Sequence, residues 1–405
     1  MSRKETWLAA IGLGLGVLFA AGLGLYSFLN SMATPLHPNP QDVRSVTSAA
    51  PLPEWADAAE QGRQLARARL VEQNLPGLSV AVGAGGDVVW AEGFGWADIE
   101  KRVPVTPGTR FRIGHASKAL TSAGVGLLLE NDRLRLGEEI QTYVPAFPRK
   151  QWPITLRQLM GHVAGIRHYR NEVDYMPSAH CERASEGLQI FADDPLLFEP
   201  ETQYKYSTFG WILVSAAVEA AAGEPFFTYM RTKIFAPLGM TATTPDSSTE
   251  SIPDRATFYY PRFSGDPSYG PELATPVDYS CFAGASGFLS TPSDLVRFGM
   301  ALSAGTLLDP ATVKKLQRPQ MLASGQETEY GLGWMLDTVT LAGEPTREAG
   351  HGSRTPLGGS TTFMTFPERG LAVAVTSNTS FAETRSIALK IAEAFAAREK
   401  SPAGK

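Results

Sequence analysis

The sequence predicts a mixed fold of the α+β type, in which an antiparallel sheet with flanking helices adjoins a mostly helical part. Two observations favour it. Strand and hairpin patterns occur near both ends of the folded part, and the segments between them show apolar residues at helical spacing. Both ends therefore contribute to one sheet, the middle forms a helical subdomain, and a cleft between the two is the expected binding place.

The N-terminal half of the predicted sheet follows a helix. Apolar residues recur at helical spacing from residue 55 to about residue 74. Two apolar runs, 78–82 and 88–90, then flank a turn at Gly85 and Gly86. Apolar runs joined by a glycine turn are typical of a β-hairpin. This hairpin should form the N-terminal strands of the sheet.

The C-terminal end repeats this pattern. Residues 361–366 and 371–377 are predicted to be two adjacent strands joined by a turn at 367–370. An amphipathic helix over about 381–397 should then close the fold. The central segment is predicted to be mostly helical, with helices at about 116–131, 155–161, 207–222, 226–236 and 292–304.

Composition limits the class of protein. The chain has 405 residues, 43% hydrophobic and 19% charged, with a net charge of −5. These values are typical of a globular, enzyme-like protein and give no reason to expect a nucleic-acid partner. No Walker-type glycine loop or Cys-x-x-Cys pair occurs, so no cofactor or metal is expected. Cys181 and Cys281 are expected to be two small buried hydrophobic residues, with a single disulfide as the alternative.

The N-terminal residues are predicted to form a membrane anchor. Residues 7–29 are uncharged and long enough to cross a bilayer, and Arg3 and Lys4 precede them, so a single-pass protein of the inner or plasma membrane is expected. A cleaved signal peptide is the alternative, but its apolar core would be unusually long. The expected order is a cytoplasmic tail (1–6), a transmembrane signal anchor (7–29), a proline-rich linker (30–55), a periplasmic or extracellular domain (56–398) and a tail (399–405).

The segment 111–121 contains the most informative pair of residues. His115 precedes Lys118 by three positions at the start of a predicted helix, so the two side chains should share a face. In a Ser-x-x-Lys motif the lysine activates a serine hydroxyl at this spacing, but here the position is held by His115. Ser117, next to Lys118, projects roughly 100° away around the helix and does not simply replace that serine.

Three further segments carry candidate site residues. Tyr206 and Thr208 lie at the start of a predicted helix, and Tyr206 is expected to face the cleft rather than the core. His162 ends another helix, where we expect it to bond carbonyls and fix the following turn rather than to act in catalysis. The triplet 351–353, His-Gly-Ser, is expected on a strand at the edge of the cleft, with a loop and a solvated His351 as the alternative.

Taken in order, these segments resemble the serine β-lactamase and penicillin-binding-protein superfamily, in its class C-like and D-Ala-D-Ala carboxypeptidase/esterase branch. The Gly-Ile-Arg-His-Tyr sequence at 165–169 and the Tyr-Ser-Thr sequence at 206–208 are similar to a mitochondrial-type subgroup and its bacterial relatives. Two more segments, 283–295 and 330–334, resemble scaffold signatures, the second of them a strand. The resemblance covers about residues 60–398 and implies the β-lactamase/transpeptidase-like fold.

The resemblance also implies a reaction. Family members cleave peptide, amide or ester bonds through an acyl-enzyme, without a cofactor. A serine in the place of His115 attacks the carbonyl, while Lys118 and Tyr206 carry its proton, which requires an ammonium to lower the pKa of the tyrosine. His351 matches the histidine or lysine on the cleft strand. Ser117, Thr208, Gly352 and Ser353 would contribute to binding.

Three departures from the family pattern bear on activity: His115, Gly161, and the exchanged order of Gly352 and Ser353. A hydroxyl moved by one residue on a strand points to the opposite face. Loss of a nucleophile leaves roughly 10³-fold catalysis over water. Three ways to an active site stay open. Ser117 could be the nucleophile if the helix start is rewound by one residue, His115 could itself be the nucleophile, or His115 and His351 could share a metal.

Two functions follow as hypotheses. The first is a membrane-anchored hydrolase-family protein whose activity is reduced or lost. The second is an inactive module that binds a peptidoglycan-like peptide or assembles with copies of itself. Expected partners are a small peptide, amide or ester ligand, the membrane through the N-terminal helix, and a second copy of the chain; the irregular loops 169–200 and 241–282 would set specificity.

Overall fold

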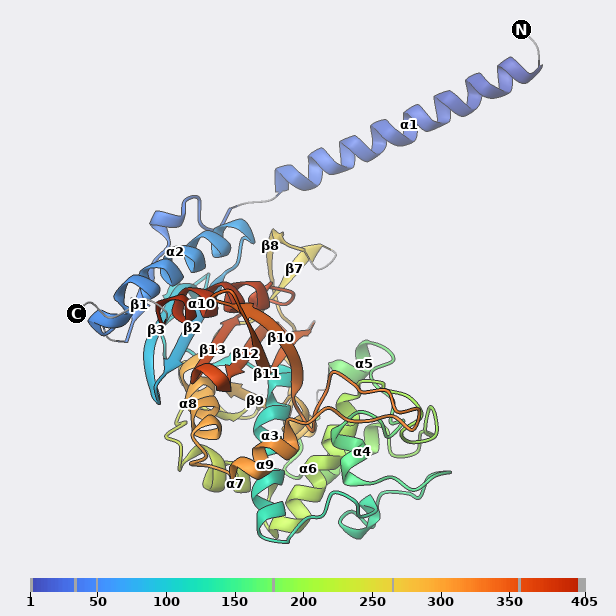
Figure 1. The fold of residues 1–405 in the computed structure, drawn as a ribbon. Coiled ribbons are helices and arrows are strands. Elements are labelled where there is room, and N and C mark those ends of the chain that lie inside the picture. The colour runs from blue at the N-terminus through green and yellow to red at the C-terminus, as the bar shows by residue number, and fades with distance from the viewer. Residues whose placement is uncertain are drawn as a thin grey trace.

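An antiparallel sheet formed by both ends of the chain lies at the centre of the fold (Figure 1). The computed structural model describes residues 3–32, 35–48, 50–176, 179–263, 266–355 and 358–399. The strand order is β1-β3-β2-β13-β12-β11-β10, with β4 pairing to β3. The strands are β1 (Ser45–Thr47), β2 (Gly77–Ala84), β3 (Asp87–Asp98), β4 (Val103–Pro104), β10 (Met335–Leu341), β11 (Glu344–Thr355), β12 (Gly359–Phe366) and β13 (Leu371–Ser377).

The two ends of the chain meet in the middle of this sheet. Leu78 of β2 pairs with Ser377 of β13, so the N-terminal hairpin and the C-terminal strands form one continuous ladder. Every residue of β2, β12 and β13 is buried. Strands covered on both faces are rich in small and β-branched apolar residues, as β2 and β13 are. The predicted sheet and α+β fold class are therefore confirmed.

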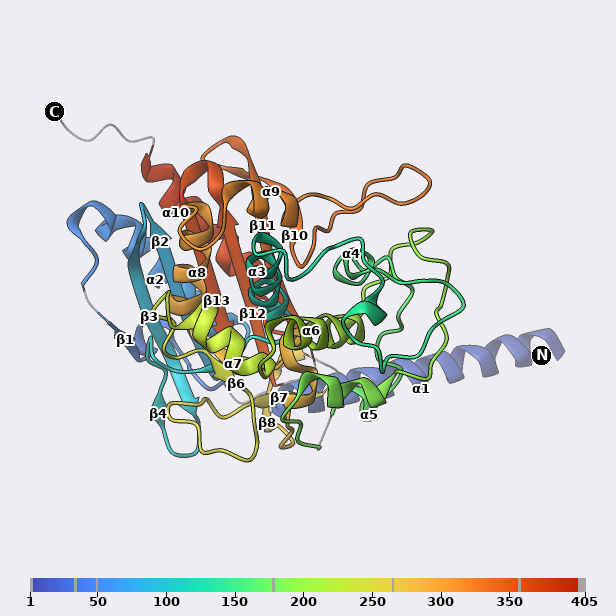
Figure 2. The same cartoon turned by 90° about the horizontal axis from the view of Figure 1, so that it is seen from below.

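Helices cover both faces of the sheet. On one face lie α2 (Ala56–Glu72) and α10 (Thr384–Glu399), which also contact each other. Trp90 of β3 stacks on Phe395 of α10 there, with ring centroids 6.0 Å apart. On the other face α8 (Pro292–Ser303) contacts β2 and β13. Figure 2, seen from below, shows α3 and α6 in front of the strands.

The central segment forms the helical part. Its elements are α3 (Ser117–Glu130), α4 (Leu156–Met160), α5 (Glu172–Tyr175), α6 (Thr208–Ala222), α7 (Phe226–Met230) and α9 (Pro310–Leu316), with the short helical turns η3 (Gly114–Ala116), η5 (Ala184–Ile190), η6 (Arg231–Phe235) and η7 (Ser280–Ala285). Two small sheets complete it, β5 (Phe111–Arg112), β9 (Phe288–Ser290) and β6 (Thr244–Pro245), and the hairpin β7 (Tyr259–Phe263) with β8 (Asp266–Leu273).

Two expected elements differ in detail. The helix expected at 226–236 is α7 followed by the π-helical turn η6. The strand expected at 330–334 is wrong, because the chain turns there: Gly331 N–H donates to Trp334 O at 2.8 Å and Gly333 has a φ of +97°. A Cβ on Gly333 would lie 3.0 Å from the carbonyl oxygen of Lys118. This turn packs against α3, and β10 begins only at Met335.

The expectation of two separate cysteines is wrong. Cys181 and Cys281 form a disulfide with a Cα–Cα distance of 4.8 Å. The bond ties the segment before η5 to the first turn of η7 across 100 residues of sequence. Sequence spacing alone did not show that the fold brings these two segments together.

The N-terminal helix α1 (Arg3–Met32) extends away from the body in both ribbon views (Figures 1 and 2). Within the described residues, the stretch Ile11–Asn30 is the one helix long and apolar enough to cross a membrane, and a signal sequence has the same properties. The stretch expected to be a linker, 30–55, packs in part on the body: β1 pairs with β3, and His37 and Val43 are buried.

Candidate active site

Four of the six histidines of the chain converge where the sheet meets the helical part. His115 in η3 and Lys118 in α3 lie beside Tyr206, which precedes α6. The ring centroid of Tyr206 is 5.5 Å from His115, 4.2 Å from His162, 5.7 Å from His168 and 6.3 Å from His351. The fold thus places histidines from η3, from the segment between α4 and α5, and from β11 around one phenol ring. We call these four histidines, together with Lys118 and Tyr206, the histidine cluster.

His115 is held as a neutral imidazole. Its side chain is 7% exposed and its Nε2 lies 3.1 Å from Thr208 Oγ1. Burial lowers the pKa of His115 well below its ordinary value, and the charge of Lys118 lowers it further. Thr208 and Tyr206 therefore both lie beside His115. The hydroxyl partner of this imidazole comes from α6 and not from its own helix.

The amine of Lys118 bonds to the backbone. Lys118 is fully buried, and its Nζ donates to Ala285 O at 2.9 Å. Nζ also lies 4.9 Å from the ring centroid of Tyr206, over the face of the phenol ring. Burial lowers the pKa of Lys118 well below its ordinary value. In the part of the chain that the structure describes, no side-chain hydroxyl is hydrogen-bonded to this amine.

Ser117 does not take the place of the missing serine. It is fully buried at the first position of α3, and its Oγ has no hydrogen-bond partner among the described residues. The helix start is not rewound: α3 runs regularly from Ser117, with Lys118 one position on. The geometry gives no contact between the Ser117 hydroxyl and the Lys118 amine.

The ring of Tyr206 lies among the histidines, but its pKa shift is opposite to the expected one. Its hydroxyl oxygen is buried and has no hydrogen-bond partner within the described residues. Burial raises the pKa of Tyr206 well above its ordinary value. The Lys118 amine lies over the ring and is not hydrogen-bonded to the hydroxyl oxygen. The expectation of a lowered Tyr206 pKa is wrong.

His162 has a structural role, although not through carbonyls. It follows the C-cap Gly161 with a φ of +60°, and its Nδ1 accepts the backbone N–H of Ser207 at 3.1 Å. Ser207 is the N-cap of α6, so His162 fixes the start of that helix. Its Nε2 is buried without a partner among the described residues. The ring also packs on Tyr330 at 4.6 Å between centroids.

His351 and Ser353 lie on β11 and not in a loop. Pairing of β11 with β10 ends at Gly350, so the following residues have no β10 partner. His351 Nδ1 lies 2.9 Å from Gly352 O, and because a carbonyl oxygen only accepts, Nδ1 carries the proton and donates it. Nε2 of the neutral ring then accepts a hydrogen bond from the Tyr330 hydroxyl at 3.0 Å. Burial lowers the pKa of His351 to about 3. The ring is therefore neutral, buried and fixed, and the alternative of a solvated histidine is wrong.

Ser353 points to the same side of β11 as His351. It is buried, and a Cβ on Gly114 of η3 would lie 2.2 Å from its Oγ. Gly114 therefore has to be a glycine for η3 to lie against β11, and its φ of +49° also favours glycine. Gly352 lies on the opposite face, as the strand alternation predicts.

Sequence reasoning did not single out three contributors. Tyr330 was assigned to the scaffold, yet its hydroxyl orients His351. His168 accepts the Thr208 N–H at 3.2 Å, and burial lowers the pKa of His168 to about 4. Ser286 follows the carbonyl that receives Lys118, and its buried Oγ has no partner among the described residues. For Tyr330 and His168 the available signal was a tyrosine or histidine within a quoted motif, whereas Ser286 carried no such signal.

Buried polar atoms without partners are concentrated here. Within the described residues they include Ser117 Oγ, His162 Nε2, Tyr206 Oη, Ser286 Oγ and Ser353 Oγ. Unpaired buried polar atoms cost free energy and are scarce in folded proteins, so such a concentration sets this part of the molecule apart. No group of three or more His, Cys, Asp or Glu residues in the described ranges is arranged to hold a metal. The shared metal considered for His115 and His351 has no third ligand there.

Comparison with known proteins identifies the family. The sequence profile of a family described as "Beta-lactamase" matches residues 21–398. The chain belongs to the beta-lactamase family. The human "Serine beta-lactamase-like protein LACTB, mitochondrial" is 29% identical over 84% of this chain and 80% of its own length. "Penicillin-binding protein 4*" of Bacillus subtilis (strain 168) is 26% identical over 67% of this chain and 62% of its own length.

Solved structures share the fold of this beta-lactamase family member. The octameric penicillin-binding protein homologue from Pyrococcus abyssi superposes with a TM-score of 0.69 at 23% identity, over 82% of this chain and 75% of the other. D-amino acid amidase from Ochrobactrum anthropi SV3 has a TM-score of 0.69 at 24% identity, over 84% of this chain and 99% of the other. The predicted superfamily and its β-lactamase/transpeptidase-like fold are confirmed.

Proposed function

We propose that this protein binds a small peptide, amide or ester ligand in the histidine cluster and hydrolyses it weakly or not at all. The single observation that supports this most strongly is the environment of Lys118. Its amine donates to a backbone carbonyl, and His115 stands one turn earlier where an attacking hydroxyl would be needed. Without that hydroxyl, the acyl-enzyme of the Ser-x-x-Lys reaction has no oxygen beside the Lys118 amine on which to form.

The retained polar atoms support binding rather than loss of the site. Tyr206, His162 and Ser353 still present buried polar atoms, and β11 still offers an unpaired edge beside His351. A carbonyl-containing ligand could accept from the Tyr206 hydroxyl and pair with that edge. Relatives named as a penicillin-binding protein and a D-amino acid amidase suggest the ligand class, a peptide or amide.

A fluorescent penicillin tests this proposal. Wild-type protein should show no covalent labelling on a denaturing gel, whereas H115S should become labelled because serine restores the Ser-x-x-Lys spacing with Lys118. H115A controls for the loss of the imidazole and should stay unlabelled. Strong wild-type labelling would contradict the proposal, and labelling at Ser117 would show that the helix phase described above is not the reactive one.

Self-assembly is the second candidate function. It is favoured by one specific observation, the octameric state named for the Pyrococcus abyssi homologue. Light scattering after size-exclusion chromatography in detergent would give the mass of the protein apart from the micelle. A mass of one chain at micromolar concentration would remove this candidate, and it would leave the ligand-binding proposal intact.

We also propose that α1 anchors the protein with its body outside the cytoplasm. The exposed apolar side chains of α1, such as Leu13, Leu18 and Phe19, pack on nothing in the described body. The Cys181–Cys281 disulfide supports an oxidising compartment. The intact mass of protein purified from membranes tests this: retention of α1 supports an anchor, and loss of the first 30 or so residues supports a cleaved signal.

A further inference from the structure

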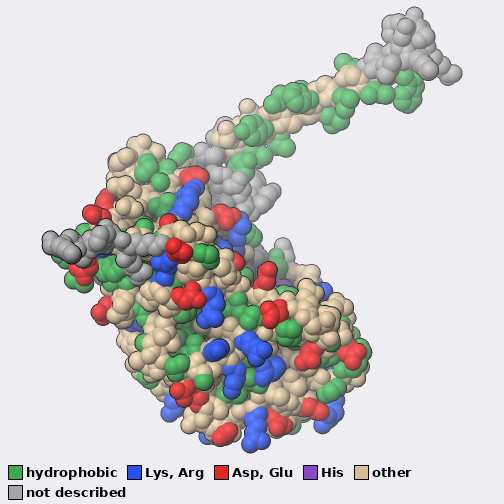
Figure 3. Space-filling model, viewed as in Figure 1, with side chains coloured by type: hydrophobic (Ala, Val, Ile, Leu, Met, Phe, Trp, Pro, Cys, Tyr) green, Lys and Arg blue, Asp and Glu red, His purple; other side chains and the backbone are tan. Residues whose placement is uncertain are grey.

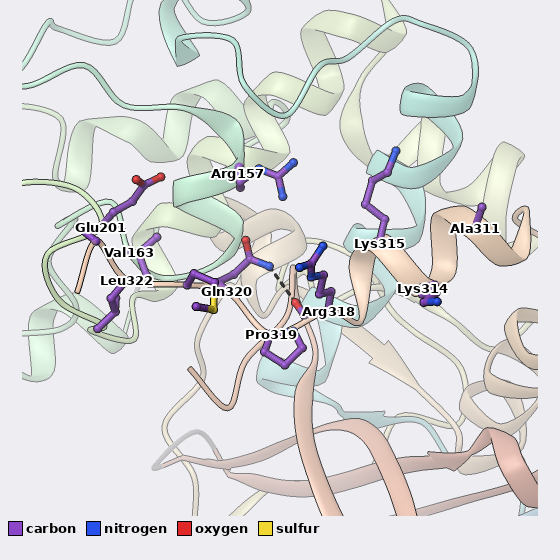
Figure 4. A pocket seen from close by; sticks show the side chains of 12 residues that line it. Arg157, Val163, Glu201, Ala311, Lys314, Lys315, Arg318, Pro319, Gln320 and Leu322 are labelled. Atoms are coloured by element: carbon purple, nitrogen blue, oxygen red, sulfur yellow. Dashed lines mark hydrogen bonds between the residues drawn. The ribbon is translucent and has the colours of Figure 1, made fainter. Parts of the chain in front are cut away.

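A cationic pocket lies outside the histidine cluster. Its volume is about 640 Å³, which is within the range of pockets that hold small molecules. The basic side chains that line it come from three places: Arg157 from α4, Lys314 and Lys315 from the last turn of α9, and Arg318 from the segment that follows. Figure 4 shows the ends of Arg157, Lys315 and Arg318 around one space.

These four cations have no carboxylate partners. No ion pair of the described residues includes any of them, whereas Arg63, Arg112 and Arg385 each bind a buried carboxylate. The one acidic residue that lines the pocket, Glu201, accepts a hydrogen bond from Gln158 at 3.0 Å instead. All four side chains are exposed, and they gather around one cavity in a chain with a net charge of −5. Figure 3 shows Lys and Arg side chains gathered on this lower part of the body.

The wall that carries Arg318 is fixed. Gln320 is buried, its side chain donates to Arg318 O at 2.8 Å, and its backbone N–H donates to Tyr330 O at 3.0 Å. Favourable interaction with the C-terminal end of α9 accounts for Lys314, Lys315 and the neighbouring Arg318, and the same effect at the end of α4 accounts for Arg157. It does not explain why cations from two different helix ends line one cavity. Val163, the neighbour of His162 in sequence, lines the pocket, and none of the residues of the histidine cluster does.

We infer that this pocket binds a soluble, phosphate-bearing anion. Two guanidinium groups can each donate two parallel hydrogen bonds to phosphate oxygens, and two lysines add charge without a fixed direction. Four cations match the charge of a pyrophosphate or of a compound with two phosphates. In Figure 1, α9 lies at the end of the body opposite α1, and this favours a soluble ligand over a headgroup of a membrane that would hold α1.

Isothermal titration of the full chain in detergent with pyrophosphate, at low salt, tests the inference. We expect saturable binding to wild type and about tenfold weaker binding to K315Q/R318Q, because two of the four cations are lost. The matched control is R231Q/K233Q, which removes two exposed cations from η6, outside the pocket. This control should bind pyrophosphate as wild type does, and unchanged melting temperatures show that both variants fold.

Three results would overturn the inference. No binding of pyrophosphate to wild type is the first. Equal losses in K315Q/R318Q and R231Q/K233Q are the second, because they would indicate attraction by overall charge. The third concerns the source of the phosphate: binding of short-chain phosphatidylglycerol, but not of pyrophosphate, would indicate a lipid ligand. None of these results depends on whether the histidine cluster binds penicillin.

Discussion

The side chain that fits at position 161, near the site, is limited by Gln320, a residue distant in sequence. A Cβ at this position would lie 2.7 Å from Gln320 Cγ, and Gln320 is held in place by its bonds to Arg318 and Tyr330. The family resemblance expects a hydroxyl residue here. The loss of that hydroxyl is therefore matched by a glutamine that fills its space.

Substitution G161S should lower the free energy of unfolding by about 1–3 kcal/mol, because a side chain is forced into occupied volume. Urea unfolding would measure this. In a Q320A background the same substitution should cost much less, since the obstructing Cγ is gone. An equal cost in both backgrounds would show that contact with Gln320 is not the reason for the glycine.

The buried histidines make stability depend on pH. The folded pKa of His351 is about 3, below the ordinary value of 6.5, so the unfolded chain binds this proton first as the pH falls. The contribution of His351 is therefore fully present above about pH 6.5 and is lost progressively toward pH 3. H351N should reduce the slope of unfolding free energy between pH 6 and 4 by about 1.4 kcal/mol per pH unit.

The matched control for this prediction is Y330F. It removes the hydroxyl that bonds to His351 Nε2 but leaves the imidazole buried, and burial is the largest cause of the lowered pKa. Y330F should therefore keep most of the wild-type pH slope. A pH slope in H351N equal to that of wild type, measured by urea unfolding at each pH, would contradict the assignment of this proton to His351.

At the scale of elements, the disulfide connects the outer loops to the site. Cys281 lies in η7, and the same turn ends at Ala285, whose carbonyl receives the Lys118 amine. The N–H of Gly284, also in η7, is bonded to Ser215 of α6. The disulfide thus helps to hold a turn that contacts both helices of the site.

Replacement of both cysteines, C181S/C281S, should lower the free energy of unfolding by about 2–5 kcal/mol. Amide hydrogen exchange should also become faster in η7, because the turn loses its tie to the segment before η5. Wild-type protein with the bond reduced serves as the control and should resemble the variant. Identical urea midpoints for the oxidised and reduced wild type would contradict this prediction.

The positions of many helices and strands were predictable from the sequence. Helices and strands with strong apolar periodicity, such as α3, α6, β2 and β13, lie where their patterns indicate. The strand β10 and the pairing of the cysteines did not follow from the sequence. The edge strand β10 is mostly exposed, and a disulfide depends on the distance between two Cα atoms that local patterns do not contain.

For the whole molecule, the boundary between the anchor and the body can be tested by truncation. The strand β1 pairs with β3, and His37 and Val43 are buried, so the body begins well before residue 55. Chains that start at residue 35 and at residue 55 should therefore behave differently.

A chain that starts at residue 35 should keep the melting temperature of the full protein and need no detergent, because α1 packs on little of the body. A chain that starts at residue 55 loses β1 and the burial of Val43, and its free energy of unfolding should fall by about 2–4 kcal/mol. Calorimetry would compare the two. Equal melting temperatures would show that residues 35–54 contribute nothing to the body.

The sequence by itself determined the family, the sheet built from both chain ends, and the absence of a serine one turn before Lys118. These depend on residue identity and local periodicity, which the chain displays directly. The tertiary structure alone decided that the Lys118 amine bonds to Ala285, that burial raises the pKa of Tyr206, and that four cations surround one pocket. Hydrogen-bond partners, desolvation and cavities arise between segments far apart in the chain, so no local pattern specifies them.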